Sequence, residues 1–393
     1  MGGPLEGIRI VDLTRLYPGP FGTQLLGDLG AEVIKIEDKN SPDYIRFFPP
    51  TFTKEGVGYM SVNRNKKSFC FDMKSERGKN LFFKLVEQSD VVVEQFRPGV
   101  IDAMGLGYNK ACRVNPKIIY CSITGFGQTG PYAQIPGHDL NYMGLAGITD
   151  LIGKKGGDPD VPGIQVADVA GGGLMAVIGI LAALHGRNRT GKGQQVDISM
   201  FDGILPFVGM IFANYQATGE IPKRGELFLS GALACYDVYQ TKDGKHVTLG
   251  ALEYKFWKKF CAIIGKPEWT EKQYSIGAEK EILQKEIAEL FKTKTRDEWV
   301  GMLREKETMC DAVNSIDEVG KDPHAIARNM IVEIDHPTEG RVKAIGIPIK
   351  FSETKAETLN PPPMLGQHNE EILKFIGLGD DEIKELKEEG VID

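Results

Sequence analysis

The chain has 393 residues, and a usual domain size of about 150 residues predicts two or three domains. Hydrophobic residues make up 41% and charged residues 26%, which is ordinary globular composition and excludes a disordered chain, a coiled coil and a collagen-like fibre. The net charge of −7 offers no overall basic field for nucleic acid or an anionic membrane. We therefore expect no nucleic-acid partner and no membrane partner.

The six cysteines are scattered and form no CxxC pair, so we expect reduced, mostly buried thiols and a cytoplasmic protein. The N-terminal segment lacks the charged and apolar regions of a signal peptide. The longest apolar stretch, Leu174 to Leu184, is interrupted by Gly179 and is too short to cross a bilayer. It predicts a buried helix.

The first third of the chain alternates strands and helices. A strand is expected at 8–13, a helix at 21–29 and a second strand at 31–37. The alternation continues with helices at 79–88 and 100–104 and strands at 91–94 and 118–123. This pattern predicts a doubly wound α/β domain with a parallel sheet. No GxGxxG follows the first strand, which speaks against a dinucleotide fingerprint.

The middle and the end of the chain change in character. Helices are expected at 139–146 and 169–185, and a strand at 195–200. After about Pro222, β-rich pieces are followed by charged helices, which predicts a second, smaller domain. Two further helices are expected at 368–376 and 381–389.

Two segments combine glycine with side chains that move protons. In Gly137-His138-Asp139-Leu140-Asn141-Tyr142, His138 lies at a predicted helix start, where its neutral form suits a base. A capping or buried histidine is the alternative. Asp168 ends an apolar, strand-like run before three glycines, whose backbone lets a large ligand approach. Asp168 is a candidate nucleophile or proton carrier, and a helix cap is the alternative.

An acidic residue and a basic cluster complete the candidates. Glu253 follows the predicted strand at 246–249, a position that a helix cap also commonly occupies. Arg64, Lys66, Lys67 and Arg97 lie near loop glycines, where basic side chains suit phosphate groups. A solvated loop is the alternative.

These motifs resemble, in the same order, those of the class III CoA-transferase superfamily of the formyl-CoA and carnitine type. The resemblance extends nearly end to end, through Pro4 to Asp12, Gly30 to Glu37, Asn63 to Lys67 with Asp72 to Lys74, Phe96 to Val100, Arg189 to Gln194 and Leu365 to His368. His138, Tyr142 and Glu253 are similar to the α-methylacyl-CoA racemase branch, whereas Asp168 matches both branches. Asp38 replaces an arginine that contacts CoA in racemases, so Lys35 or Lys39 would have to substitute.

The resemblance implies an interlocked homodimer whose large Rossmann-like α/β domain is built from both chain ends, with a smaller α+β domain. The expected division is 1–205 for the large domain, 206–228 for a linker, 229–325 for the small domain and 326–393 for the return to the large domain.

It also implies an acyl-CoA substrate, with no metal and no separate cofactor. His138 and Asp168 would flank the α-carbon of a 2-methylacyl-CoA and exchange its proton through an enolate. Glu253 would orient His138, and Tyr142 would donate to Asp168. CoA would contact Arg64, Lys66, Lys67 and Arg97, with Gly137 and Asp139 at the thioester oxygen.

Two other functions stay open. A CoA-transferase would use Asp168 as a nucleophile and pass through an aspartyl-CoA thioester, leaving His138 to position the substrate. A CoA-binding protein without activity is a different class, and the presence of His138, Asp168 and Glu253 together speaks weakly against it.

Overall fold

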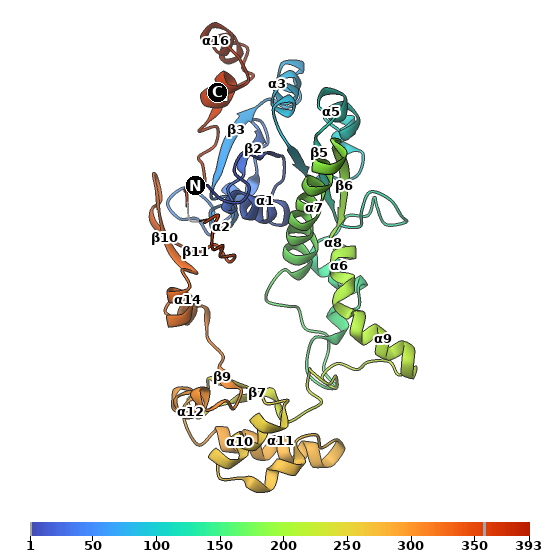
Figure 1. The fold of residues 1–393 in the computed structure, drawn as a ribbon, viewed down its shortest axis with the longest axis vertical. Coiled ribbons are helices and arrows are strands. Elements are labelled where there is room, and N and C mark those ends of the chain that lie inside the picture. The colour runs from blue at the N-terminus through green and yellow to red at the C-terminus, as the bar shows by residue number, and fades with distance from the viewer. Residues whose placement is uncertain (1, 357–358) are drawn as a thin grey trace. The chain divides into compact units, whose positions relative to one another are not determined.

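The computed structural model describes residues 2–356 and 359–393, and the chain divides into two compact units. Figure 1 shows both units, which are described separately here. Unit 1 comprises Met1–Ala146, Gly163–Val208 and Pro323–Asp393; unit 2 comprises Gly147–Pro162 and Gly209–Asp322. This division differs from the expected one chiefly at 147–162, a segment that was expected in the large domain but belongs to unit 2.

A six-stranded parallel sheet forms the centre of unit 1 (Figure 1), which confirms the predicted α/β class. Its order is β3-β2-β1-β4-β5-β6. The strands are β1 (Arg9–Asp12), β2 (Glu32–Asp38), β3 (Lys66–Phe71), β4 (Val91–Glu94), β5 (Ile119–Thr124) and β6 (Gln194–Ser199). Most central positions are buried valine or isoleucine, as expected for parallel strands covered on both faces. The chain order reverses between β1 and β4, which creates a crevice at the carboxyl ends of these strands.

Helices and the C-terminal segment cover this sheet. The helices before β6 are α1 (Pro18–Asp28), α2 (Val57–Val62), α3 (Glu76–Glu87), α4 (Val100–Ala103), α5 (Tyr108–Val114), α6 (Asp139–Leu145) and α7 (Met175–Thr190). The core also includes residues of α15 (Asn369–Phe375) and α16 (Asp380–Glu388). At β3, Ser68 N donates to His368 Nδ1 and His368 N donates to Ser68 O, both at 3.1 Å. Both ends of the chain therefore build unit 1.

Strand β3 was not expected from the sequence, because its first residues are basic. Lys66 pairs with Val33 and Phe71 with Asp38 in the parallel ladder to β2. The side chains of Phe69 and Phe71 are fully buried. Tertiary packing, and not local polarity, therefore determines that these residues form a strand. The basic cluster is therefore partly a strand and not a solvated loop.

The apolar helix of unit 1 is longer than expected. A π-helical segment at Ala167–Leu174 continues into α7, and the combined helix of 24 residues has the length and hydropathy of a membrane span. Half of its most apolar window is buried, and it packs against α1, β5 and β6. This burial indicates a core helix.

Unit 2 is an α+β unit with an antiparallel sheet. Its strands are β7 (Tyr236–Gln240), β8 (His246–Gly250) and β9 (Cys310–Ala312), in the order β7-β8-β9. Its main helices are α9 (Gly209–Thr218), α10 (Tyr254–Ile263), α11 (Gly277–Phe291) and α12 (Arg296–Leu303). Trp257, Phe291 and Trp299 fill the core.

Three shorter helices and a hairpin connect these parts. The helices are α8 (Met200–Ile204) after β6, and α13 (Ile316–Val319) and α14 (Pro323–Ala327) near the end of unit 2 and the return to unit 1. The hairpin pairs β10 (Ile331–His336) with β11 (Gly340–Ile345).

Candidate active site

A cavity of about 570 Å³ lies in unit 1 at the carboxyl ends of the central strands. Arg15 and Leu16 come from the loop after β1, and Gln95, Phe96 and Arg97 from the loop after β4. These two loops flank the point where the strand order reverses, which is the usual ligand position in such sheets. The remaining wall contains Thr124, Gly125, Gly137, His138, Tyr142 and Asp168. The cavity is large enough for part of a coenzyme-sized ligand.

His138 lies at the N-cap of α6, as the sequence predicts. Its backbone is extended, and its N–H donates to Asn141 Oδ1 at 2.9 Å. The residue is exposed and lines the cavity. The helix start therefore presents the imidazole to the cavity and not to the core.

Asp168 lines the same cavity but lies in the first turn of the π-helical segment. The expected strand before it is wrong, since residues 164–166 form no strand. Its backbone N–H donates to Asp139 Oδ1 at 3.0 Å, and its carboxylate accepts no hydrogen bond from the residues that the structure describes. Burial and the Asp139 carboxylate raise the pKa of Asp168 to about 6, against the opposing influence of His138. Asp168 thus holds a proton closer to neutral pH than an ordinary carboxyl group does.

The glycines after Asp168 serve a different purpose from the one expected. A Cβ on Gly171 would lie 2.3 Å from Met200 O, and one on Gly173 would lie 2.9 Å from Pro18 O. Both glycines are buried and let the π-helical segment approach α8 and α1 closely. Close packing of backbone, not access for a ligand, explains their presence.

Tyr142 is buried one helical turn after His138. Its hydroxyl donates to Gly137 O at 2.5 Å, and not to Asp168 as expected. Burial and the nearby Asp168 carboxylate raise the pKa of Tyr142 to about 12, although Arg97 opposes this shift. The tyrosine therefore fixes the Gly137–His138 turn while its ring stays close to Asp168 and Arg97.

Two arginines form what we call the basic wall, Arg15 and Arg97. The guanidinium of Arg15 lies over the Phe96 ring, 5.2 Å from its centroid. Neither arginine forms an ion pair with the residues that the structure describes. Sequence reasoning found Arg97 but missed Arg15, whose signal is its position just after the first strand of a parallel sheet. Leu16 beside it has a positive φ of 63°, a local strain of the kind that clusters at functional sites.

The other basic candidates have partners inside the fold. Lys66 is buried and pairs with Asp12 at 3.0 Å, and Arg64 is buried and pairs with Asp28 at 2.6 Å. Their burial and ion pairs argue against the expected phosphate contacts. Lys67 is partly exposed but pairs with Glu32 and Glu371, and its contact with CoA stays a prediction. Lys35, a possible substitute for the missing arginine, is also buried and pairs with Asp43.

Glu253 belongs to unit 2 and precedes α10. It is exposed, and its carboxylate forms no hydrogen bond or ion pair within residues 2–356 and 359–393. Glu253 therefore occupies the N-cap position of α10, as the capping alternative expects, but its side chain makes no capping bond there. Pairing with His138 stays a prediction.

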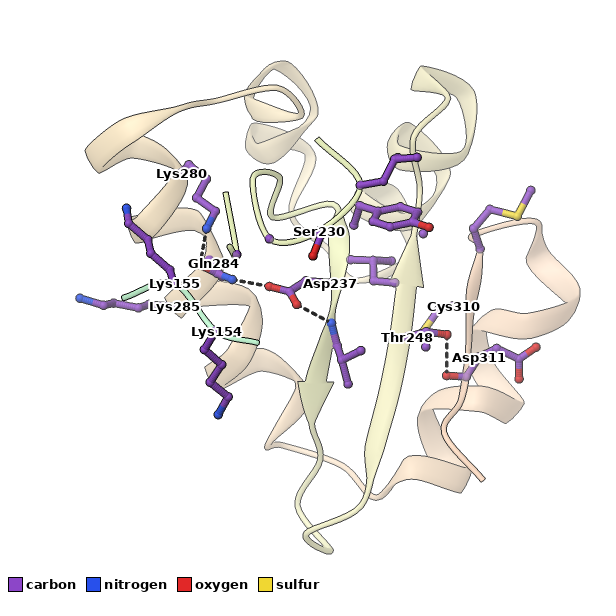
Figure 2. Close-up of a pocket in the computed structure, with 18 of the residues that line it drawn as sticks. Lys154, Lys155, Ser230, Asp237, Thr248, Lys280, Gln284, Lys285, Cys310 and Asp311 are labelled. Carbon is purple, nitrogen blue, oxygen red and sulfur yellow. Dashed lines mark hydrogen bonds between the residues drawn. The ribbon is translucent and has the colours of Figure 1, made fainter. Parts of the chain in front are cut away.

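Unit 2 contains a larger cavity, of about 1180 Å³. Figure 2 shows Lys154, Lys155, Lys280 and Lys285 on one side of it and Asp311 on the other. Gln284 on α11 donates to Asp237, and Arg304 pairs with Asp311. None of the catalytic candidates from the sequence lines this cavity.

Comparisons with known proteins agree with the resemblance seen in the sequence. The chain is 36% identical to human succinyl-CoA:glutarate CoA-transferase, over 99% of this chain and 90% of the relative. It is 32% identical to human alpha-methylacyl-CoA racemase, over 99% and 97%.

Solved structures show the same likeness. A CAIB/BAIF family protein from Brucella suis matches with a TM-score of 0.84 and 32% identity, over 96% of this chain and all of that one. Rv3272 from M. tuberculosis matches with a TM-score of 0.79 and 28% identity, over 94% and 99%. The model of CoA-transferase family III matches residues 5–369. The chain belongs to CoA-transferase family III.

Proposed function

We propose that this protein racemises a 2-methylacyl-CoA by moving its α-proton between His138 and Asp168. The observation that carries this proposal is that both side chains line one cavity, where Asp168 has a pKa raised to about 6. Two proton-carrying groups of different chemistry in one cavity suit removal of a proton from one face and its return to the other. A CoA thioester is the substrate class that the family supports.

The mechanism follows from the residues around this pair. One of the two groups removes the α-proton, and the other, already protonated, delivers a proton to the opposite face. The negative charge that develops on the thioester oxygen needs a donor nearby. The backbone N–H of Asp139 at the start of α6 has no acceptor among the described residues and is the donor that we assign. Tyr142 keeps the preceding turn in place through its bond to Gly137.

Substrate binding would use the basic wall. Arg15 and Arg97 carry positive charge and form no ion pair with the described part of the chain, and guanidinium groups bind phosphate through paired hydrogen bonds. We assign the phosphates of CoA to this wall, with the thioester toward His138 and Asp168. Glu253 is expected to orient His138 once the two groups meet.

Deuterium exchange tests this function. In deuterated water, the wild type should exchange the α-proton of a 2-methylacyl-CoA and interconvert its two epimers, as NMR can follow. His138→Ala should lower exchange by about 10²–10⁴-fold, the range for loss of a general base. His324→Ala, an exposed histidine on α14, is the matched control. Unchanged exchange in His138→Ala would overturn the two-base mechanism.

A CoA-transferase activity is the second candidate, because relatives of this chain are CoA-transferases. Asp168 would attack the acyl-CoA carbonyl and form a mixed anhydride with release of the CoA thiolate. The thiolate would then attack the aspartyl carbonyl, which releases the acyl group as its free carboxylate and leaves an aspartyl-CoA thioester. Hydroxylamine trapping, with a panel of acyl-CoAs and a free acid acceptor, detects that intermediate. We expect no adduct on Asp168, and finding one would favour the transferase.

A second copy of this chain is the expected partner. Helix α9 has no buried residue, and Met210, Phe212 and Tyr215 on it are exposed. An apolar helix without burial in its own chain is typical of a surface that another chain covers. Light scattering should give twice the mass of 43.3 kDa, and Phe212→Glu should shift the protein toward the monomer. A monomeric wild type would contradict the dimer.

A further inference from the structure

A buried carboxyl group lies at the start of the turn that carries Phe96 and Arg97. Glu94 is the last residue of β4, and its side chain is 2% exposed. Its Oε2 accepts from Phe96 N at 2.7 Å, and the hydroxyl of Ser122, its neighbour on β5, donates to it as well. This carboxyl group therefore fixes the turn by which the chain leaves the sheet and enters the wall.

Glu94 has no cationic partner within residues 2–356 and 359–393. It forms no ion pair with the residues that the structure describes, and the groups that face it from neighbouring elements are acidic or neutral. They are Asp102 on α4, Asp197 on β6, and Tyr120 and Cys121 on β5. Burial, then Asp102 and Asp197, raise the pKa of Glu94 to about 7, although the bonds from Ser122 and Phe96 act in the opposite direction. Glu94 thus holds a proton closer to neutral pH than an ordinary glutamate does.

The turn that Glu94 fixes is connected to the cavity at each of its residues. Gln95 Oε1 accepts from Gly19 N at the start of α1, at 3.0 Å. Phe96 lies under Arg15, and Arg97 lies close enough to lower the pKa of Tyr142. A change in the protonation or position of Glu94 therefore affects both arginines of the wall through Gln95, Phe96 and Arg97.

We propose that Glu94 is a positioning residue for the basic wall, and that the wall binds an anionic ligand together with one proton on Glu94. An ionised carboxylate at the start of the turn that carries Arg97 repels the phosphates that Arg15 and Arg97 attract. Protonation removes that charge, leaves an oxygen to accept from Phe96 N, and adds a donor toward Ser122. The ligand then favours the protonated form, and by linkage the protonated form favours the ligand. This inference rests on the proposed binding of a CoA thioester in this cavity.

Calorimetric titration with free coenzyme A at pH 6 and pH 8 tests the linkage. From pH 6 to pH 8, the affinity for CoA should fall in both proteins. The fall should be about fivefold larger in the wild type than in Glu94→Gln, which is a typical size for coupling between sites. Glu94→Gln keeps an acceptor for Phe96 N but cannot ionise, so it should bind more tightly than the wild type at pH 8. Glu87→Gln, an exposed glutamate on α3, is the matched control and should behave as the wild type. Protonation of CoA itself contributes equally to all three proteins.

A second variant keeps the test valid if Glu94→Gln does not fold. Ser122→Ala removes a donor that favours the ionised form, so the affinity of this variant should fall at a higher pH than that of the wild type. The positioning role predicts that Glu94→Ala raises the KM for the acyl-CoA about tenfold and changes kcat less than twofold. A purely structural role would instead lower the folded fraction and leave KM unchanged.

The outcomes separate this inference from the proposed function. Equal pH dependence in wild type and Glu94→Gln, with CoA binding intact, would overturn the linkage alone. An unshifted Ser122→Ala profile would also overturn it. Failure of the wild type to bind CoA would overturn the proposed function, and this inference with it.

Discussion

Unit 1 contains two groups of charged residues that face different surroundings. One group lies within the fold, where Asp12 pairs with Lys66, Lys35 with Asp43, and Arg46 with Glu37. The other lines the cavity, where Arg15, Arg97, His138 and the Asp168 carboxylate have no ion-pair partner among the described residues. The first group is neutralised internally and stabilises the structure, whereas the second is left available for a ligand.

The strongest test of this comparison is Asp168→Asn. The variant keeps the size of the side chain but cannot carry the proton or act as a nucleophile. Turnover should fall by about 10³–10⁴-fold, with an unchanged unfolding midpoint in urea. The exposed Asp381→Asn on α16 is the control. Full activity of Asp168→Asn would contradict both the proton transfer and the nucleophilic attack proposed for Asp168.

Lys66→Met should show the opposite behaviour. It leaves the Asp12 carboxylate buried without its nearest cation, so we expect a loss of about 3–5 kcal/mol in the free energy of unfolding. Burial alone would raise the pKa of Asp12, but Lys66 and Lys35 lower it to about 2. The contribution of the Asp12 carboxylate is therefore present above pH 4 and is lost as the pH falls toward 2, whereas burial lowers the pKa of Lys66 to about 8 and offsets part of this contribution. Urea unfolding at pH 7 measures the effect, and kcat per folded molecule should not change.

Arg97→Met tests the group that lines the cavity. Removing this guanidinium should weaken CoA binding about tenfold and leave stability within about 0.5 kcal/mol. The matched control is Arg113→Met, which removes an exposed arginine on α5. Equal effects of the two variants on CoA affinity would exclude Arg97 from the binding surface.

Asp139→Asn sharpens the assignment of Asp168. The amide oxygen still accepts from Asp168 N, but one of the negative charges that raise the pKa of Asp168 is removed. The pKa of Asp168 should fall by about one unit. A pH–rate profile should then show its acid limb, near pH 6 in the wild type, moving to lower pH. An acid limb that stays in place would mean that another group determines it.

The smallest effect is expected at Lys67. Its ion pairs with Glu32 and Glu371 are partly exposed, so Lys67→Met should change stability by less than about 1 kcal/mol. Because this lysine has internal partners, the comparison predicts unchanged CoA affinity, measured by calorimetry. A tenfold loss of CoA affinity in Lys67→Met would instead support the phosphate contact that the sequence predicts for Lys67.

The sheet could be predicted where hydrophobic patterning is local. Strands β1, β2, β4 and β5 are short apolar runs separated by glycine or polar turns, and the structure confirms them. Strand β3 and the β10–β11 hairpin were missed, because their polar residues interrupt the apolar pattern of a strand. These strands form through tertiary packing, which local sequence does not show.

The site could be predicted only in part. His138, Tyr142 and Asp168 were found because motifs mark them, and the structure brings them to one cavity. Arg15 was missed because its role depends on β4 lying beside β1, and strand order is not contained in local periodicity. The burial of Lys66 was missed for the same reason, since its partner Asp12 is 54 residues away.

The attachment of α15 and α16 to β3 affects how the chain folds during synthesis. Hydrophobic residues of these helices, among them Ile372, Leu373 and Leu386, belong to the same core as Phe69 and Phe82. The growing chain on the ribosome completes the sequence of unit 2 first, because that unit ends at Asp322. The apolar residues at the β3 edge of the unit 1 sheet therefore stay exposed until α15 and α16 have left the ribosome. Slow translation of residues 323–393 would lengthen the interval in which this chain is most exposed to aggregation and to chaperones.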